Sequence, residues 1–135
     1  MATTRSTEGR APSVAPQAAF FKALGDATRL RLTVLLATHG ETCVCMLAEA
    51  LAAPDFRISR HLTILKAAGL VESRRDGTWI YYKLNAARDR LEERLQRCLR
   101  DCFADHPVVQ EDLRRLSKAS CGGRAKTRRA GGRRR

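Results

Sequence analysis

The sequence predicts a mainly α-helical domain that carries one small β-hairpin. Apolar residues recur at helical spacing in several stretches between residues 17 and 116, and glycine or proline separates these stretches. One later segment, LVESRRDGTWIYYKL, instead contains two strand-like runs on either side of Asp76-Gly77. A chain of 135 residues is long enough for one such domain with a tail at each end, here residues 1–16 and 117–135.

The first two helices are predicted from apolar periodicity and from capping residues. The first covers Gln17 to Leu24, and the second begins after Asp26, a good N-cap, and ends at Gly40. Three apolar residues of the second helix share one face and should be buried: Leu30, Val34 and Leu35.

The next two helices are separated by a short break at Pro54-Asp55. The third covers roughly Cys43 to Ala52, and its inward-facing residues are Leu47, Ala50 and Leu51. The fourth, FRISRHLTILKAA, repeats apolar residues at the spacing of a buried stripe: Ile58, Leu62 and Leu65. Gly69 follows where a helix C-cap glycine belongs.

The remainder of the domain is a hairpin and two further helices. Asp76-Gly77 favours a tight type I′ turn between the two strands. A long helix is expected from Ala86 to residue 104, His106-Pro107 interrupts it, and a last helical stretch reaches about Leu116.

The order helix, helix, short turn, helix and hairpin is that of a winged helix-turn-helix, in which one helix can enter the major groove of double-stranded DNA. The polar side of the fourth helix supplies basic and hydroxyl groups, and we expect these residues to contact DNA: Arg57, Ser59, Arg60, His61, Thr63 and Lys66. Arg74 and Arg75 beside the hairpin turn are placed for phosphates or a minor groove. The alternative for the basic residues is a solvated face without a partner.

Net charge supports a nucleic-acid partner but is unevenly distributed. The formal charge is +12, and the last 19 residues carry eight Lys or Arg and no acidic residue. We expect this tail to be a disordered basic arm that strengthens phosphate contact, or else only a solubilising tail. No apolar run is long enough for a membrane span and residues 1–16 lack the apolar core of a secretory signal, so a cytoplasmic protein with reduced thiols is expected.

The stretch ETCVCMLAE places two cysteines two residues apart at the start of the third helix. Successive helical residues turn by about 100°, so Cys43 and Cys45 would point about 200° apart. We therefore expect ETCVC to form the first helical turn without an ion, with Thr42 as N-cap, and a bound ion to distort that turn. Thiolates select soft or borderline ions, although both cysteines could also be small core residues.

From Ala23 to Leu84 the chain resembles the ArsR/SmtB family of metal-responsive repressors. Four pieces carry the resemblance: ALGDATRLRLTVLLA, ETCVCMLAEAL, RISRHLTILKAAGLV and DGTWIYYKL. The resemblance implies a homodimer that binds operator DNA when metal-free and releases it on binding its ion. It also implies that Cys43 and Cys45 bind arsenite or antimonite, or alternatively Cd(II), Pb(II) or Zn(II), and that Ser59, Arg60 and His61 lie in the DNA-reading helix.

The sequence departs from the arsenite-sensing pattern at two positions. Ala48 stands where a third cysteine is common, and Met46 stands where an aspartate is usual. A third sulfur could come from Cys98, Cys102 or Cys121, although the first two fall on the apolar stripe of the long helix and are expected to be buried. A thiol redox switch stays open as another reading, whereas no nucleophile–base pair, phosphate loop or carboxylate dyad suggests an enzyme.

Dimerisation is expected through the long helix, together with Gln17 to Leu24. The residues that should pair the subunits are Leu91, Leu95, Leu99 and Phe103. A two-fold dimer presents its two reading helices to half-sites about one DNA turn apart, so the operator should be an imperfect palindrome.

Overall fold

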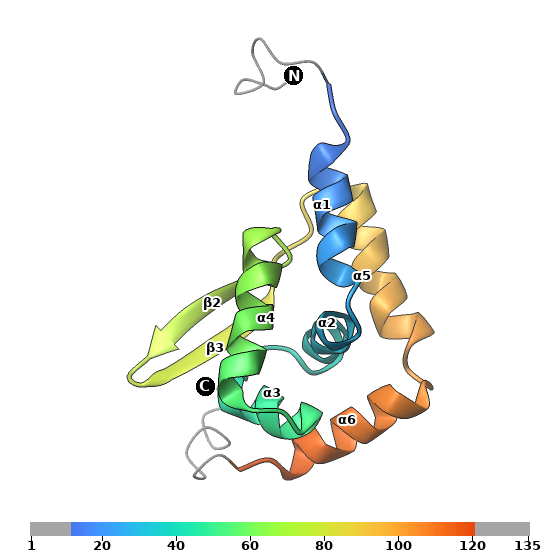
Figure 1. The fold of residues 1–135 in the computed structure, drawn as a ribbon. Helices are drawn as coiled ribbons and strands as arrows, with labels where there is room; N and C mark the ends of the chain where they lie inside the picture. Colours follow the sequence, from blue (N-terminus) through green and yellow to red (C-terminus); the bar gives the residue numbers. More distant parts are fainter. Residues whose placement is uncertain (1–11, 121–135) are drawn as a thin grey trace.

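The computed structural model describes residues 12–120, which form six helices and a three-stranded sheet (Figure 1). In chain order the elements are α1 (Ala15–Leu24), α2 (Ala27–His39), β1 (Thr42–Cys43), α3 (Val44–Leu51), α4 (Asp55–Ala67), β2 (Val71–Asp76), β3 (Trp79–Leu84), α5 (Arg90–Cys102) and α6 (Pro107–Lys118). The expected mainly α architecture with a small hairpin is confirmed. The disorder expected for the two tails concerns mostly residues outside the described range.

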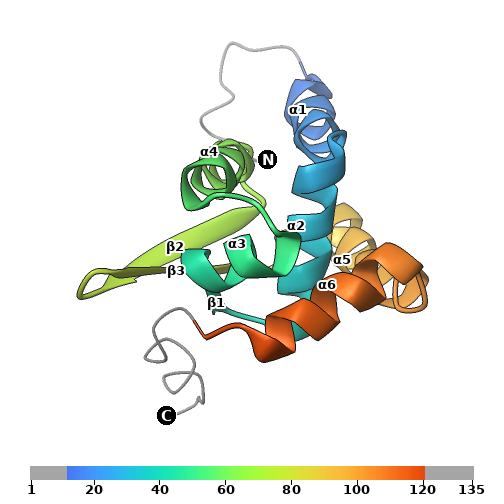
Figure 2. The same cartoon turned by 60° about the horizontal axis from the view of Figure 1, so that its bottom comes forward.

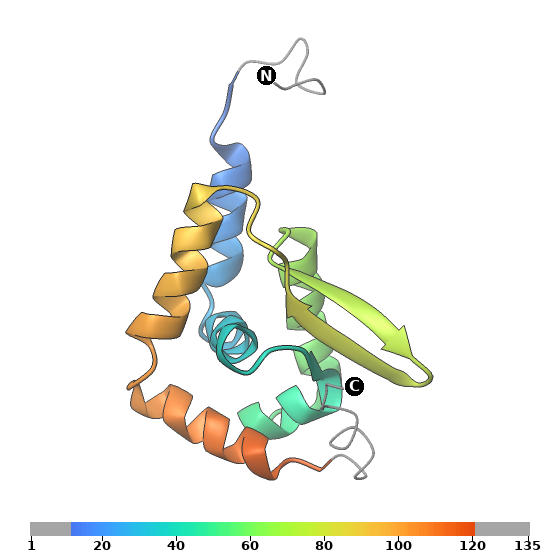
Figure 3. The ribbon, with the colours of Figure 1, turned by 180° about the vertical axis from the view of Figure 1, so that it is seen from behind.

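Helix α2 forms the centre of the molecule, with the hairpin on one side and α1 and α5 on the other (Figures 1 and 3). The carboxylate of Asp26 accepts a hydrogen bond from the Arg29 backbone N–H at 3.0 Å, which confirms it as the N-cap. Leu32, Val34 and Leu35 are almost completely buried because neighbouring elements cover α2 on several sides.

The sheet has the strand order β1-β3-β2 and is antiparallel throughout. Strand β1 pairs Thr42 with Tyr82 and Cys43 with Tyr81, so it adds a third strand to the predicted hairpin. The expectation that Thr42 and Cys43 belong to a helical turn is therefore wrong. Pairing with β3 holds Cys43 in an extended conformation (φ −80°, ψ 157°), and α3 begins only at Val44.

The turn between β2 and β3 also differs from the prediction. Asp76 pairs with Trp79, so the two central residues are Gly77 and Thr78. Only Gly77 has a positive φ, at 65°. This is the pattern of a type II′ turn, with glycine at the first central position, whereas the predicted type I′ turn needs a positive φ at both.

Helix α4 is built as the periodicity predicts. Its apolar stripe is fully buried: Ile58, Leu62 and Leu65. Gly69 has a φ of 87° just past the helix, and Leu70 N–H donates to the Leu65 carbonyl at 3.0 Å. The glycine thus ends the helix in a left-handed conformation that a residue with a Cβ rarely adopts, and α4 is fixed beside the start of β2.

Helix α5 begins at Arg90, later than the predicted Ala86, because Asp89 caps it. Leu99 is buried against Val34 and Val109 in a small second core. Cys98 and Cys102 are exposed, so the expectation that they are buried is wrong within one chain. The inward face of α5 lies on the Leu99 side, and the two cysteines belong to its outer face.

Helix α6 is tied to the rest of the domain by charged side chains. Arg31 donates two hydrogen bonds to the buried carboxylate of Asp112, at 2.9 and 2.7 Å, and Arg115 donates to the Ala50 carbonyl of α3. The helix continues to Lys118 and Ala119 is buried, so ordered structure extends past the predicted end at Leu116. In the part of the chain that the structure describes, no helix is long and apolar enough to cross a membrane.

Candidate thiol site and nucleic-acid interface

The outer face of α4 is the candidate nucleic-acid-binding surface. The helix lies on the outside of the molecule above the hairpin (Figure 2), because its apolar stripe packs inward. Four predicted contact residues are exposed and one is half-buried: Arg57, Arg60, Thr63 and Lys66, then Ser59. Residues 56–67 contain no acidic side chain, so the face suits the phosphates and base edges of a major groove.

Two apolar side chains on this face were not among the predicted contacts. Phe56 is 64% exposed and Ile64 is 40% exposed. They lie four residues before and after Arg60, so helical spacing could have identified them. Apolar side chains in a major groove can contact thymine methyl groups, which makes both candidates for base recognition.

His61 lies at the edge of this surface and turns toward α2. Its Nδ1 atom is 3.3 Å from the guanidinium of Arg29 and 3.9 Å from the carboxylate of Asp26. The ring is half-buried. This position favours a role in holding α4 against the start of α2 over the predicted base contact.

The hairpin carries the two predicted arginines on opposite faces of β2. Arg74 pairs across the sheet with Tyr81, and Arg75 pairs with Ile80. The Arg74 guanidinium donates two hydrogen bonds of 2.9 Å to the carboxylate of Glu41 and lies 4.5 Å above the centre of the Tyr81 ring. The Arg74 side chain is still 52% exposed, so a phosphate could reach it. That phosphate would bind beside the Glu41 carboxylate or compete with it for the guanidinium.

The two close cysteines form the candidate ion site. The sulfurs of Cys43 and Cys45 are 3.4 Å apart. Two thiolates that share one ion at about 2.3 Å lie about 3.3–3.8 Å apart for angles of about 90–110° at the ion. The sulfurs are therefore already close enough, and the expectation that an ion must first distort a helical turn is wrong. The reason is β1, which keeps Cys43 outside the helix.

Burial sets the protonation of this site. Cys43 is 1% exposed, and burial raises the pKa of its thiol. The backbone N–H groups of Met46 and Cys45 at the start of α3 oppose this rise in pKa, whereas the charge of Asp55 adds to it. Cys43 is thus a neutral thiol at pH 7, and an ion must displace its proton.

A row of three side chains joins the thiol site to the hairpin. Cys43 lies opposite Tyr81, and Tyr81 lies opposite Arg74, so all three share one face of the sheet. Burial is the main reason that the pKa of Tyr81 is raised. Glu41, two residues before Cys43, accepts two hydrogen bonds from Arg74 and so links the other end of this row back to β1. Sequence reasoning missed Glu41 and Tyr81, since nothing local in the sequence predicts that β1 pairs with β3.

The described residues supply two sulfurs to this site and no third. Within residues 12–120 no group of three His, Cys, Asp or Glu side chains could hold a metal ion. Cys98 and Cys102 lie together on α5, with their sulfurs 3.4 Å apart, across α2 from the hairpin (Figure 3). Cys121, the other predicted source, lies outside the described residues.

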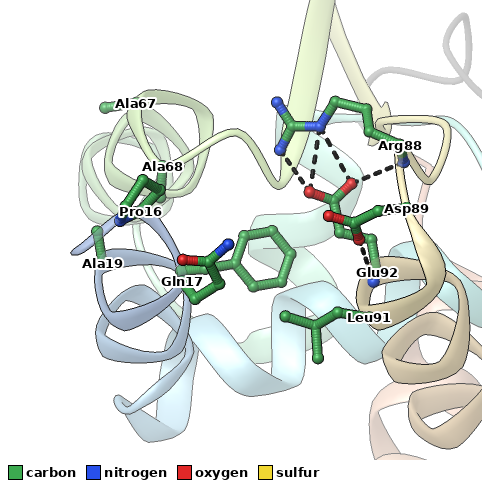
Figure 4. Close-up of a pocket in the computed structure, with 10 residues that line it drawn as sticks. Pro16, Gln17, Ala19, Ala67, Ala68, Arg88, Asp89, Leu91 and Glu92 are labelled. Atoms are coloured by element: carbon green, nitrogen blue, oxygen red, sulfur yellow. Dashed lines mark hydrogen bonds and ion pairs between the residues drawn. The ribbon is translucent and has the colours of Figure 1, made fainter. Parts of the chain in front are cut away.

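A pocket of about 260 Å³ lies between the start of α1, the end of α4 and the start of α5 (Figure 4). Arg88 and Glu92 at its edge pair with each other at 2.7 Å, and the Glu92 carboxylate also accepts the Arg88 backbone N–H. These polar groups are therefore already satisfied. Leu91 also lines the pocket and is 39% exposed, while the other predicted pairing residues are half-buried or buried: Leu95, Phe103 and Leu99.

Comparison with known proteins relates this chain to bacterial transcriptional regulators. Residues 26–73 match the family of bacterial regulatory proteins named after arsR. The chain is 51% identical over 65 residues to arsenic resistance transcriptional regulator ArsR1 of Pseudomonas putida, a match covering 48% of this chain and 51% of that one. It is 36% identical over 110 residues to the arsenical resistance operon repressor of Escherichia coli, covering 78% of this chain and 89% of that one.

The fold also matches a solved structure. The homodimeric winged helix-turn-helix DNA-binding domain Mb0332 from Mycobacterium bovis, described as a possible ArsR-family transcriptional regulator, aligns with a TM-score of 0.55 and 32% identity. That match covers 73% of this chain and 83% of the other. The exposed basic helix, the projecting hairpin and these relatives agree: the chain is a winged helix-turn-helix transcriptional regulator, not an enzyme, and belongs to the ArsR family.

Proposed function

We propose that this regulator is a metal(loid)-responsive repressor that binds operator DNA as a homodimer and dissociates when As(III) or Sb(III) binds to Cys43 and Cys45. The observation that carries the proposal is the 3.4 Å separation of the two sulfurs, one on strand β1, which pairs with the hairpin, and the other in the first turn of α3. Similarity to arsenic resistance regulators supports the choice of ion.

In the DNA-bound state α4 enters the major groove and the hairpin contacts the flanking backbone. The exposed basic and hydroxyl side chains of α4 meet bases and phosphates, and Arg75 adds a charge on the hairpin. Pairing through α5 places two such helices on a two-fold operator.

Capture of arsenite replaces two of its hydroxyl groups with sulfur. Two thiols lose their protons, two As–S bonds form, and two water molecules leave, so no oxidant or reductant is needed. Soft thiolate ligands favour such ions over magnesium or calcium. Cd(II), Pb(II) and Zn(II) would use the same two sulfurs, with release of protons to solvent.

The bound ion acts on DNA binding through the sheet. Fixing Cys43 to the ion constrains β1, and the row of Cys43, Tyr81 and Arg74 carries that constraint to the hairpin. The ion then favours a state in which α4 and the hairpin fit DNA poorly. Coupling of about 1–3 kcal/mol corresponds to about a 5- to 150-fold loss of affinity, and operator DNA must weaken ion binding by the same factor.

Fluorescence anisotropy with a duplex selected from a random-sequence library tests the proposal. Cys43→Ser and Cys45→Ser should bind this duplex as the parent protein does and should not release it when arsenite is added. Cys98→Ser is the matched control, since its sulfur lies on α5, and it should respond normally. A normal response in both Cys43→Ser and Cys45→Ser would place the inducer site elsewhere.

Parallel titrations separate the competing inducers. Release by cadmium but not arsenite would assign the site to divalent cations. Release by peroxide alone would make the cysteines a redox switch, because no ion is then required.

A further inference from the structure

We propose that Phe56 recognises a thymine of the operator, through contact between its ring and the C5-methyl group of that base in the major groove. The inference rests on the proposed binding of operator DNA, and it names a residue and a base that give part of the sequence specificity. It involves no cysteine, so it does not depend on which ion is the inducer.

Phe56 is displayed on the outer side of α4. Its side chain is 64% exposed, and among the described residues it belongs to neither of the two buried apolar clusters. With about 100° of rotation per residue, it lies about 120–180° around the helix axis from the three residues of the buried stripe: Ile58, Leu62 and Leu65. The ring is therefore on the side of α4 that a bound partner would meet first.

The backbone that carries Phe56 is held firmly. Pro54 is the N-cap of α4, and its carbonyl accepts hydrogen bonds from the N–H groups of Arg57 and Ile58 at 3.1 and 3.2 Å. Ile58, two residues after Phe56, is completely buried and fixes the same turn to the core. An aromatic ring on such a turn is presented at a defined height and angle, which base recognition requires.

The charges around Phe56 identify DNA as the partner. Single exposed apolar side chains are common and by themselves indicate no partner. Here the exposed guanidinium groups of Arg57 and Arg60 lie on either side, and residues 56–67 contain no acidic side chain. Asp55 precedes Phe56 but lies about 100° away around the axis. A basic face with one large apolar side chain matches a groove that has phosphates along its edges and methyl groups on its floor.

The position of Phe56 along α4 also suits base contact. It lies in the first turn of the helix, and in helix-turn-helix proteins the N-terminal residues of the reading helix contact base edges. Among the four bases of DNA, thymine alone presents a methyl group in the major groove, and phenylalanine is one of the side chains that contact it. Thymine is therefore the base that this ring fits.

Arg60 sets where that thymine should be. Four residues at about 1.5 Å each place Arg60 about 6 Å further along the helix axis than Phe56. Arginine pairs with the O6 and N7 atoms of guanine, and base pairs are stacked about 3.4 Å apart. The thymine contacted by Phe56 should lie about two base pairs from the guanine contacted by Arg60.

Replacement of thymine by deoxyuridine tests the proposal, because deoxyuridine keeps the pairing with adenine and lacks only the methyl group. Each thymine of the selected duplex is replaced in turn, and binding is measured by anisotropy. For the parent protein, one thymine in each half-site should be sensitive, with a loss of about three- to fivefold, the effect of removing one buried methyl group. Phe56→Ala should bind the thymine and deoxyuridine duplexes equally. Phe56→Leu, which keeps an apolar side chain, should retain most of the difference.

Phe21→Ala is the matched control. It removes the same ring from a 49% exposed position on α1, so the difference between the thymine and deoxyuridine duplexes should be kept in full. Replacement of guanine by 7-deazaguanine, which lacks N7, locates the base read by Arg60, since Arg60→Ala should abolish that effect. Thermal unfolding of Phe56→Ala should match the parent, because the ring packs against neither buried cluster.

Two results would overturn the inference and leave the proposed function standing. One is equal binding of all thymine and deoxyuridine duplexes by the parent, and the other is a methyl effect that persists in Phe56→Ala. A persistent methyl effect together with a changed association state of Phe56→Ala would assign the ring to a protein interface. If the parent selects no duplex from the library, the proposed function itself fails and this inference fails with it.

Discussion

Glu41 is the residue whose role follows most directly from its contacts. Its carboxylate holds Arg74 on the hairpin, and it lies two residues before Cys43, one of the two proposed ion ligands. Arg74 also lies over the ring of Tyr81, which pairs with Cys43 of β1. Arg74 therefore contacts both Glu41, which precedes β1, and a residue that pairs with β1. An arginine in this position can report on the ion site and contact a phosphate with the same guanidinium.

We therefore expect Glu41→Gln to reduce the release of operator DNA by the inducer more than it reduces the affinity for the inducer itself. The substitution removes the charge that binds Arg74, and a half-exposed pair of this kind is worth up to about 1 kcal/mol. We expect the loss of operator affinity on adding arsenite to shrink by about two- to fivefold, measured by anisotropy with and without arsenite.

Glu72→Gln makes the same change of charge on the same hairpin. It breaks only the exposed pair with Lys83 at 3.8 Å and should leave the arsenite response intact. Identical behaviour of the two variants would mean that net charge, and not the Glu41–Arg74 contact, controls the response.

At the scale of single elements, most features that depend on neighbouring residues could be predicted from the sequence, whereas those that depend on distant pairing could not. The α4 stripe, the Asp26 cap and the glycine after α4 depend on residues within a few positions, and the sequence contains them all. Strand β1 has only two residues and exists because β3 lies beside it, nearly forty positions away. No local pattern carries that information, so Cys43 was assigned to the wrong element.

Helix α5 shows a second limit of periodicity. Leu91, Leu95, Cys98 and Cys102 follow helical spacing, but the spacing does not say which side of the helix meets the core. The structure buries Leu99 and leaves Cys98 and Cys102 exposed, a rotation of about 100° from the predicted centre of the stripe. The candidate site was predicted in its cysteines and basic residues, whereas its support from Glu41 and Tyr81 was not.

The start of α5 gives a stability prediction. Glu92 is 8% exposed, and hydrogen bonds from Arg88 hold its pKa below the ordinary value of 4.5. A depressed folded-state pKa contributes stability above about pH 4.5 that is lost as the pH falls through the folded pKa. Glu92→Gln should lower the free energy of unfolding by about 1 kcal/mol at pH 7 and flatten its fall on acidification, measured by urea denaturation.

Glu93→Gln is the neighbouring control for this effect. Its side chain is 63% exposed and forms a long ion pair of 3.8 Å with Arg97, which contributes little to stability. The free energy of unfolding should therefore change little at any pH. Equal effects of the two substitutions would show that the Arg88–Glu92 contact contributes nothing specific to stability.

At the scale of the whole molecule, the proposed function requires that two chains pair. Of the residues predicted to pair the subunits, Leu91 is the most exposed within one chain, and it lies at the same end of the molecule as α1. Leu99 is buried against Val34 and Val109 within one chain, so it can stabilise α5 but cannot itself contact a second chain.

Leu91→Glu should therefore shift the protein toward monomer and weaken operator binding at least tenfold, because a charge would enter an apolar interface. Analytical ultracentrifugation gives the association state and anisotropy gives the affinity. A dimeric Leu91→Glu protein would exclude this face of α5 as the interface.

The spacing of the sulfurs of Cys43 and Cys45 has a consequence for selectivity among ions. With metal–sulfur bonds of about 2.3 Å, their separation of 3.4 Å corresponds to a bite angle of about 95°. A trivalent ion with a lone pair is pyramidal and accepts that angle without displacing β1. Tetrahedral zinc prefers an angle of about 109°, which would require the sulfurs to lie about 3.8 Å apart. Moving Cys43 by this amount would strain the pairing of β1 with β3. If the two sulfurs bind the inducer as proposed, we therefore expect the resting backbone to favour a pyramidal ion over a tetrahedral one through coordination geometry alone.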